Sequence, residues 1–184
     1  MNYSLVIRLS PMHAIFEVTD SCGQPAYRAF TRLMSLTDKA AVTDGENRIV
    51  ARFCCRLISM RSVHRIIMAD GGIMTVRTDL RRAGETVIIP ENGWQVCTNR
   101  ACQSYHILDR RQNLLADVYR PLKTAKNRCR ITVADQENAD RLISLVIVLE
   151  HTVMARSQAR EGGAHAVTGP RFEPLPPPYS STQD

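Results

Sequence analysis

Short stretches in which apolar and polar residues alternate occupy most of this chain. Alternation with a period of two is typical of strands that bury one face. We predict about twelve strands, at residues 3–9, 14–19, 25–32, 40–43, 48–58, 63–69, 73–79, 86–90, 94–98, 104–108, 114–119 and 128–133. Many short strands separated by regular turn signals indicate an all-β sandwich or barrel.

Four segments repeat one pattern, in which an apolar strand is followed by Asp, a polar turn and a second strand. They are FEVTDSCGQPAYR, AAVTDGENRIVAR, RIIMADGGIMTVR and YHILDRRQNLLADVY. Asp at the first position of a turn caps the backbone, and we expect this role for Asp20, Asp44, Asp70 and Asp109. Glycine adopts positive φ without strain, and we expect that conformation at Gly23, Gly45, Gly71 and Gly72. A further hairpin is predicted to turn at Glu91-Asn92-Gly93, so the chain is predicted to form an antiparallel meander.

Residues 140–156, DRLISLVIVLEHTVMAR, form the most apolar stretch of the chain. A membrane-spanning helix needs about 20 predominantly apolar residues, whereas Glu150 and His151 interrupt the run here. The β-branched residues 146–148 make a strand the rival interpretation. Asp135 is a good N-cap and neither Gly nor Pro occurs from 135 to 160, so we predict a helix at about 136–156. Apolar residues cover its whole circumference, so we expect it to be buried on all sides.

A barrel would surround such a helix. Eight strands close a barrel that side chains can fill, whereas about twelve strands leave a wider lumen that the helix would occupy. The predicted fold is therefore mainly β, a closed antiparallel barrel of about twelve strands around a central hydrophobic C-terminal helix, spanning residues 1–156. Residues 157–184 are poor in apolar residues and end in GPRFEPLPPPYSSTQD, which predicts a disordered, Pro-rich tail. Its Pro-Pro-Pro-Tyr fits the ligand form of WW domains, but the motif is too short to assign a partner.

The composition favours a folded, basic domain with free thiols. Apolar residues make up 44% of the chain and aromatic residues 5%, and the net charge is +6 with a pI of about 9.2. This balance favours anionic partners, such as lipid headgroups, nucleic acid or acidic proteins, without choosing among them. The six cysteines lack metal-ligand spacing, and the N-terminus has no basic region ahead of a long apolar run. We therefore predict a cytoplasmic protein with reduced cysteines and no signal peptide.

The chain lacks the common catalytic motifs: it has no G-x-S-x-G, no Gly-rich phosphate loop before a helix and no H-E-x-x-H. The neighbours Glu150 and His151 are either a buried acid–base pair or part of a helix end that emerges from the barrel, and we favour the helix end. A plugged barrel also leaves no large interior pocket for a substrate. We therefore predict a protein that is not an enzyme, with no catalytic residue, no metal site and no cofactor.

Basic residues in and around two predicted loops are the best candidates for binding. Loops at one end of the barrel would group them into an anion-binding face, although solvated loops on a basic protein give the same pattern. The low aromatic content argues against nucleic acid as the partner. The candidate residues for an anionic ligand are Arg81, Arg82, Arg120, Lys123, Lys126, Arg128 and Arg130.

The chain resembles the LURP-one-related proteins, whose barrel is shared with tubby C-terminal domains and phospholipid scramblases. The resemblance covers about residues 3–156 and rests on the order and spacing of several segments. These are the four repeated units, SLTDKAAVTDGENRIVARF, SYHILDRRQNLLADVYRP and YRPLKTAKNRCRITVADQENADRLISLVIVLEHTV. The resemblance implies a twelve-stranded barrel around a C-terminal helix. In the related families, tubby domains bind phosphoinositides and scramblases act at membranes, whereas most bacterial LURP-one-related members lack an assigned activity.

We therefore expect a non-enzymatic binding module of the LURP-one-related group. Its ligand is expected to be anionic phospholipid at a membrane surface or a protein partner, and any membrane contact is expected to be peripheral, without a transmembrane segment. The alternative is a small-molecule-binding protein or enzyme that uses an external groove of the barrel. The sequence does not indicate an oligomeric state.

Overall fold

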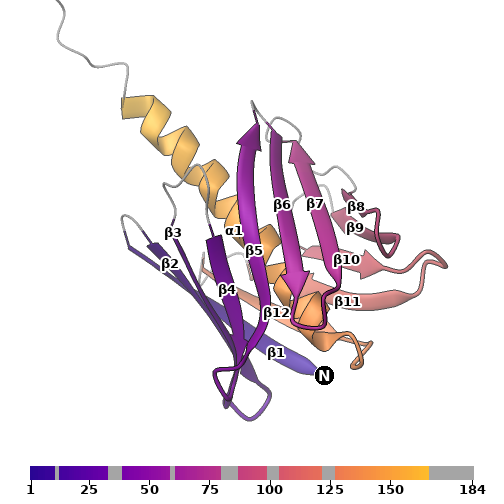
Figure 1. Cartoon of the computed structure of the whole chain (residues 1–184). Coiled ribbons are helices and arrows are strands. Elements are labelled where there is room, and N and C mark those ends of the chain that lie inside the picture. Colours follow the sequence, from indigo (N-terminus) through magenta and orange to yellow (C-terminus); the bar gives the residue numbers. More distant parts are fainter. Residues whose placement is uncertain are drawn as a thin grey trace, which may run out of the picture.

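The structure, a computed structural model of the chain, describes residues 1–10, 13–32, 39–58, 61–79, 87–98, 104–121 and 127–165. Within these residues the chain forms twelve strands and one helix (Figure 1). The first six strands are β1 (Asn2–Leu9), β2 (His13–Asp20), β3 (Pro25–Arg32), β4 (Lys39–Asp44), β5 (Ile49–Ile58) and β6 (Arg61–Met68). The others are β7 (Ile73–Asp79), β8 (Val87–Ile89), β9 (Trp94–Thr98), β10 (Ser104–Leu108), β11 (Leu114–Tyr119) and β12 (Arg128–Val133), followed by the helix α1 (Ala139–His165).

All twelve strands belong to one antiparallel sheet with the order β7-β6-β5-β4-β3-β2-β1-β12-β11-β10-β9-β8. Consecutive strands pair from β1 to β7 and from β8 to β12, and β1 also pairs with β12. β7 and β8 stand at the two ends of this order and lie in contact, but no paired register joins their described residues. The sheet is therefore a nearly closed barrel with α1 inside it (Figure 1), which confirms the predicted fold class.

The two ends of the barrel differ in the elements that they carry. Successive connections of an antiparallel meander alternate between ends. The β2–β3, β4–β5, β6–β7, β8–β9 and β10–β11 turns therefore share one end with the start of α1, hereafter the turn end. The helix leaves the barrel at the opposite end, hereafter the exit end (Figure 1).

Three of the four predicted aspartates cap their turns as expected. Each carboxylate accepts hydrogen bonds from the backbone N–H groups two and four residues later, and these aspartates are Asp20, Asp44 and Asp109. In the remaining turn Met68 holds the equivalent position, because its N–H pairs with the carbonyl of Gly72. Asp70 lies two residues later and accepts only from the Gly72 N–H, so the role predicted for Asp70 is wrong.

The fourth residue of each of these turns has a positive φ, whether or not it is a glycine. The residues concerned are Gly23, Asn47, Gly71 and Gln112. The prediction of a positive φ is therefore confirmed for Gly23 and Gly71 and wrong for Gly45 and Gly72. In three of the turns a register shift follows in the paired strands, as in hairpins that combine a type I turn with a bulge. Gly93 has a φ of 72° in the β8–β9 turn, where a turn was predicted.

The helix begins and ends later than predicted. The N–H of Leu142 donates to the carbonyl of Asn138, so Asn138 is the N-cap, and the Asp135 carboxylate binds the Asn138 side chain at 2.8 Å. No proline interrupts the sequence that follows, and α1 continues to His165. Residues 157–165, which we predicted to be disordered, are therefore helical, and residues 166–184 lie outside the described part.

The core of the protein lies between the helix and the inner face of the barrel. Residues 142–152 of α1 are all buried, and large inward side chains from several strands surround them, among them Phe16, Phe53, Ile66, Ile107 and Ile131. The start of the helix is fastened to β3 and to the β6–β7 turn at the turn end. Tyr27 donates a hydrogen bond to Asp140 at 2.7 Å, and Asp70 forms an ion pair with Arg141. The prediction that the helix fills the barrel is confirmed.

Candidate functional site

The residues predicted to bind an anion fall into three groups. Four of them lie outside the described residues, namely Arg81, Arg82, Lys123 and Lys126. Arg128 and Arg130 are exposed on the outer face of β12, where alternate residues point inward and outward. Arg120, immediately after β11, instead contacts the helix. Grouping of the whole set into one binding face therefore stays a prediction, and Arg120 has a structural partner.

Arg120 forms a two-pronged ion pair with Glu150 of α1. Its Nη2 lies 2.7 Å from Oε1 and its Nε lies 3.1 Å from Oε2 of the carboxylate. The Tyr105 hydroxyl donates a further hydrogen bond to Oε1 at 3.0 Å. Burial lowers the pKa of Arg120, but the adjacent Glu150 charge outweighs it, so the net shift is upward and the guanidinium stays charged. The pair, with the Tyr105 hydroxyl, joins the middle of the helix to β10 and to the end of β11.

Our preferred interpretation of Glu150 and His151, a helix end emerging from the barrel, is wrong. Both residues are buried, with exposed fractions of 3% and 4%. The helix is long enough to carry them deep into the lumen before it leaves, which the local sequence did not reveal. Glu150 binds Arg120 and Tyr105, whereas His151 packs among aromatic rings.

The two buried histidines lie close together beneath β6. The rings of His64 and His151 meet edge to face with their centroids 6.0 Å apart, and Phe16 and Phe53 flank His151. His64 Nε2 also lies 2.9 Å from the Thr152 hydroxyl. That hydroxyl donates its single hydrogen to the carbonyl of residue 148, so its oxygen is left to accept a hydrogen bond from Nε2 of His64.

These interior groups fasten the helix to the barrel. Burial, reinforced by the charge of Glu150, raises the pKa of Tyr105 and of Cys129, so both are neutral at pH 7. Among the described side chains, no group of three or more His, Cys, Asp or Glu is placed to hold a metal ion. The interior cluster therefore explains how the helix is positioned, and the binding candidates lie on the outer surface.

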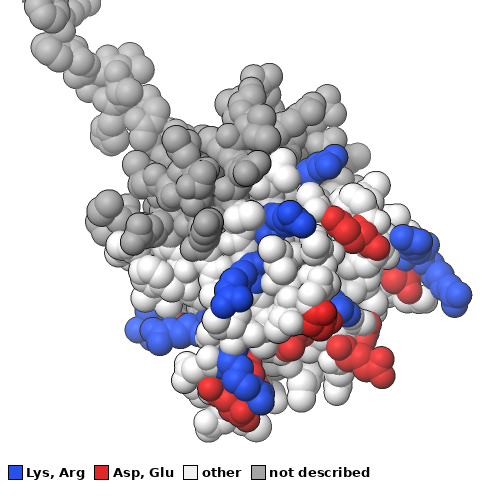
Figure 2. Space-filling model, in the orientation of Figure 1, with Lys and Arg blue, Asp and Glu red and all other residues white. Residues whose placement is uncertain are grey.

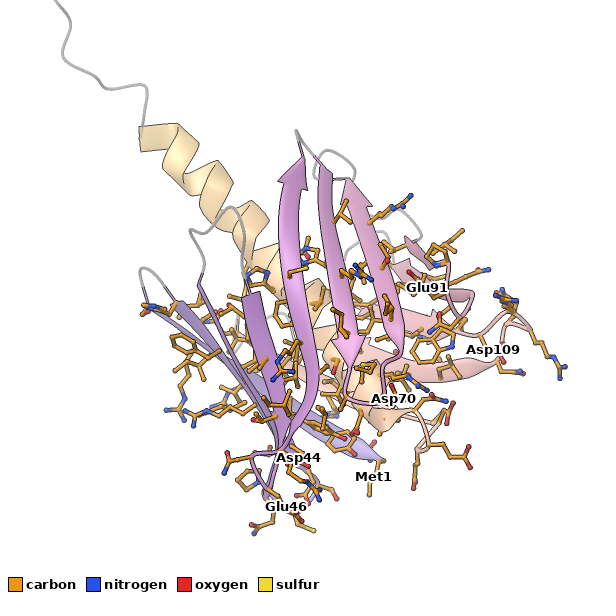
Figure 3. All side chains as sticks on the ribbon, in the orientation of Figure 1. Met1, Asp44, Glu46, Asp70, Glu91 and Asp109 are labelled. Atoms are coloured by element: carbon orange, nitrogen blue, oxygen red, sulfur yellow. The ribbon has the colours of Figure 1, made fainter. Side chains whose placement is uncertain are left out.

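Acidic residues gather at the turn end of the barrel. Figure 3 shows Asp44, Glu46, Asp70, Glu91 and Asp109 on successive turns at this end. Desolvation raises the pKa of Asp44, but hydrogen bonds from the Arg48 side chain and from the backbone of the turn lower it overall. Hydrogen bonds from the side chain and backbone of Asn113 lower the pKa of Asp109, so both carboxylates carry charge at neutral pH. The turn end is therefore an unfavourable surface for an anionic ligand.

The outer face of β5, β6 and β7 carries positive charge, and sequence reasoning missed it. Arg52, Arg65 and Arg77 are exposed there, together with Ile67 and Ile73, and we call these five residues the arginine face. Figure 2 shows blue side chains in a diagonal row over these strands, with white surface between them. Strand alternation in the sequence placed each arginine on an outer face, but only the strand register brings the three together.

Within the described residues, no helix combines the length and the apolar character needed to cross a membrane.

Comparisons with known proteins bear on the fold. No protein-family model matches the chain, and no curated protein matches it. Among solved structures, the chain is similar to a protein from Arabidopsis thaliana known from an X-ray structure, with a TM-score of 0.52 and 16% sequence identity. The similarity covers 81% of this chain and 90% of the plant protein. At this level of identity the comparison establishes a shared fold and nothing about the ligand.

Proposed function

We propose that this protein is a non-enzymatic binding module that associates with acidic membrane surfaces through the exit end of its barrel. In this role it is cytoplasmic and binds the membrane peripherally. The observation that carries the proposal is the collection of acidic residues at the opposite end. The resemblance to the LURP-one-related and tubby families agrees with such a role, because tubby domains bind phosphoinositides.

The charge of the chain is distributed unevenly along the barrel axis. The acidic residues at the turn end are Asp20, Asp44, Glu46, Asp70, Glu91, Asp109, Asp135, Glu137 and Asp140. The basic residues there are Arg48, Arg110, Arg111 and Arg141. Since the whole chain has a net charge of +6, the positive excess lies on the rest of the molecule. An acidic membrane would therefore repel the turn end and attract the other parts of the barrel.

The strands that flank the two basic segments of the sequence end or begin at the exit end. β7 ends and β8 begins at that end, and so do β11 and β12. Arg81, Arg82, Lys123 and Lys126 lie in the sequence between these strands. Each Lys or Arg close to an acidic membrane contributes about 1 kcal/mol of attraction, which salt screens within about a Debye length. Several such residues together are enough for reversible binding.

A vesicle sedimentation experiment tests the proposal with the full chain. Phosphatidylcholine vesicles are compared with vesicles that also contain phosphatidylserine, between about 0.05 and 0.3 M salt. We expect binding only to the acidic vesicles and a steep loss as salt rises. Equal binding to both kinds of vesicle, or binding to neither, would refute the proposal.

A pair of charge-reversal variants locates the contact. Lys123→Glu/Lys126→Glu is expected to weaken binding to acidic vesicles by about ten-fold or more, because two attractive charges become repulsive. The matched control is Arg110→Glu/Arg111→Glu, which reverses two charges at the turn end and is expected to change binding by less than about two-fold. Arg120 is left intact in both variants, because a glutamate there would face the buried carboxylate of Glu150. Equal losses in the two variants would show that the exit end is not the contact surface.

A further inference from the structure

The arginine face carries more positive than negative charge, although the carboxylate of Glu91 lies close enough to Arg77 for the arginine charge to help lower the pKa of Glu91. Elsewhere on the wall, Glu17 lies between Arg8 and Arg28, and Asp117 pairs with His106. Among the described outward side chains on β5, β6 and β7, the charged residues are the three arginines alone. Among the described residues, neither Arg52 nor Arg65 forms an ion pair with an acidic side chain. The face therefore presents positive charge that is available to a partner.

The strand register arranges these side chains as a regular array. Arg52, Ile67 and Ile73 stand opposite one another across β5, β6 and β7, and Arg65 lies two residues from Ile67 along β6. Arg77 pairs with Val63, which lies two residues before Arg65 along β6. Neighbouring strands are about 4.8 Å apart and two residues along a strand span about 6.6 Å. Successive arginines on the diagonal are therefore separated by about 8 Å at their Cα atoms.

The two isoleucines favour a protein partner over a membrane. Ile67 and Ile73 are 43% and 37% exposed, so more than half of each side chain is already packed into the wall. Ile67 is the last residue but one of β6 and Ile73 is the first of β7, and the two residues pair across these strands. Their backbone is therefore held in the sheet and cannot project into a bilayer as a loop tip does. Partly exposed aliphatic side chains between arginines are suited to contact with another rigid or extended chain, since arginine is enriched at protein interfaces.

We propose that the arginine face binds an extended acidic segment of a protein partner, with carboxylates at alternate positions. Alternate residues of an extended chain are about 6.6–6.8 Å apart and point to the same side. The arginine side chains are long enough to take up the small difference from the diagonal spacing, and each guanidinium can bind one carboxylate through two hydrogen bonds. The apolar residues of the segment then contact Ile67 and Ile73. This interaction uses the side of the barrel and is independent of the exit end.

The test uses the peptide Gly-Glu-Val-Glu-Val-Glu-Gly as the probe and the full chain labelled with ¹⁵N. NMR titration at low salt is expected to shift the amide signals of β5, β6 and β7 and to leave those of β10 and β11 unchanged. Arg65→Glu is expected to weaken the peptide at least ten-fold, and Ile67→Ser several-fold. The matched control, Arg28→Glu, reverses an exposed strand arginine beside Glu17 and is expected to change the affinity less than two-fold.

Three results would overturn the inference. The first is the absence of saturable peptide binding by the native protein. The second is an equal loss of affinity in Arg65→Glu and Arg28→Glu, which would indicate attraction to net charge rather than to this face. The third is a loss of binding to phosphatidylserine vesicles in Arg65→Glu without peptide binding in the native protein, which would assign the face to a membrane. If the native protein fails to bind vesicles but the peptide results are as expected, the proposed membrane function is refuted and the inference about the arginine face stands.

Discussion

Arg120→Ala is expected to destabilise the barrel strongly, because the buried carboxylate of Glu150 loses its charged partner. The change removes hydrogen bonds of 2.7 and 3.1 Å and leaves only the bond from the Tyr105 hydroxyl. The Glu150 side chain is 4% exposed, so water cannot replace the lost donors, whereas the Arg120 side chain is 21% exposed. Removing one partner of a buried pair costs about 3–5 kcal/mol. Since Arg120 is partly hydrated, we expect a loss near the lower value, about 3 kcal/mol.

Urea unfolding followed by circular dichroism measures this loss directly. The midpoint should fall while the dependence of the unfolding free energy on urea stays the same, because the folded surface is unchanged. In a thermal melt, about 3 kcal/mol corresponds to a decrease of roughly 6–12 °C for a domain of this size.

Two comparisons separate the ion pair from other effects of the substitution. Arg111→Ala removes an arginine from an exposed turn and should change the unfolding free energy by no more than about 0.5 kcal/mol. Arg120→Met/Glu150→Met removes both charges and should be more stable than Arg120→Ala alone, because no charge is left buried without a partner. If Arg120→Ala is as stable as Arg111→Ala, the pair does not hold the helix and the reasoning fails.

Further predictions concern the core, a thiol and the seam of the barrel. Val146→Asp places an unpaired charge where the native side chain is fully buried and should abolish cooperative melting, as seen by circular dichroism; a normal melt would show that the helix is not the core. Iodoacetamide at pH 7.5 should label the exposed Cys22 but not the buried Cys129, whose pKa is raised by burial and then by Glu150, and peptide mapping checks this. Glu91→Gln should lower the unfolding free energy by no more than about 1 kcal/mol at pH 7, because the Glu91 carboxylate accepts the β7 backbone N–H of Thr75. Partial burial raises the pKa of Glu91, but the Thr75 hydrogen bond and the charge of Arg77 lower it overall, so this stability is present above the ordinary glutamate pKa and lost as pH falls. A difference from the native protein that persists at pH 3 would contradict that assignment.

The sequence by itself determined the local elements of this protein and their general arrangement. Alternation with a period of two depends only on which residues face the core, so it located the twelve strands to within a few residues. The apolar circumference of residues 142–149 required a helix buried on all sides, and a barrel was the structure able to surround it. Aspartate capping is also a local interaction, which is why three of the four turns were predicted correctly.

The tertiary structure alone decided which distant residues meet. Arg120 is one of several basic residues in its segment. Only the position of the helix inside the barrel shows that Arg120 forms an ion pair with Glu150. The burial of Glu150 and His151 likewise depends on how far the helix extends through the lumen, a length that the local sequence does not encode.

The arginine face depends on strand register, which is set by pairing between segments far apart in the chain. A shift of one residue would turn the arginine and the exposed isoleucine side chains of a strand inward together, so the alternating pattern restricts the register. The pattern does not show which strands are neighbours. Arg52, Arg65 and Arg77 each occupy an ordinary outward position in their own strands. Their alignment across β5, β6 and β7 follows from the cross-strand pairs.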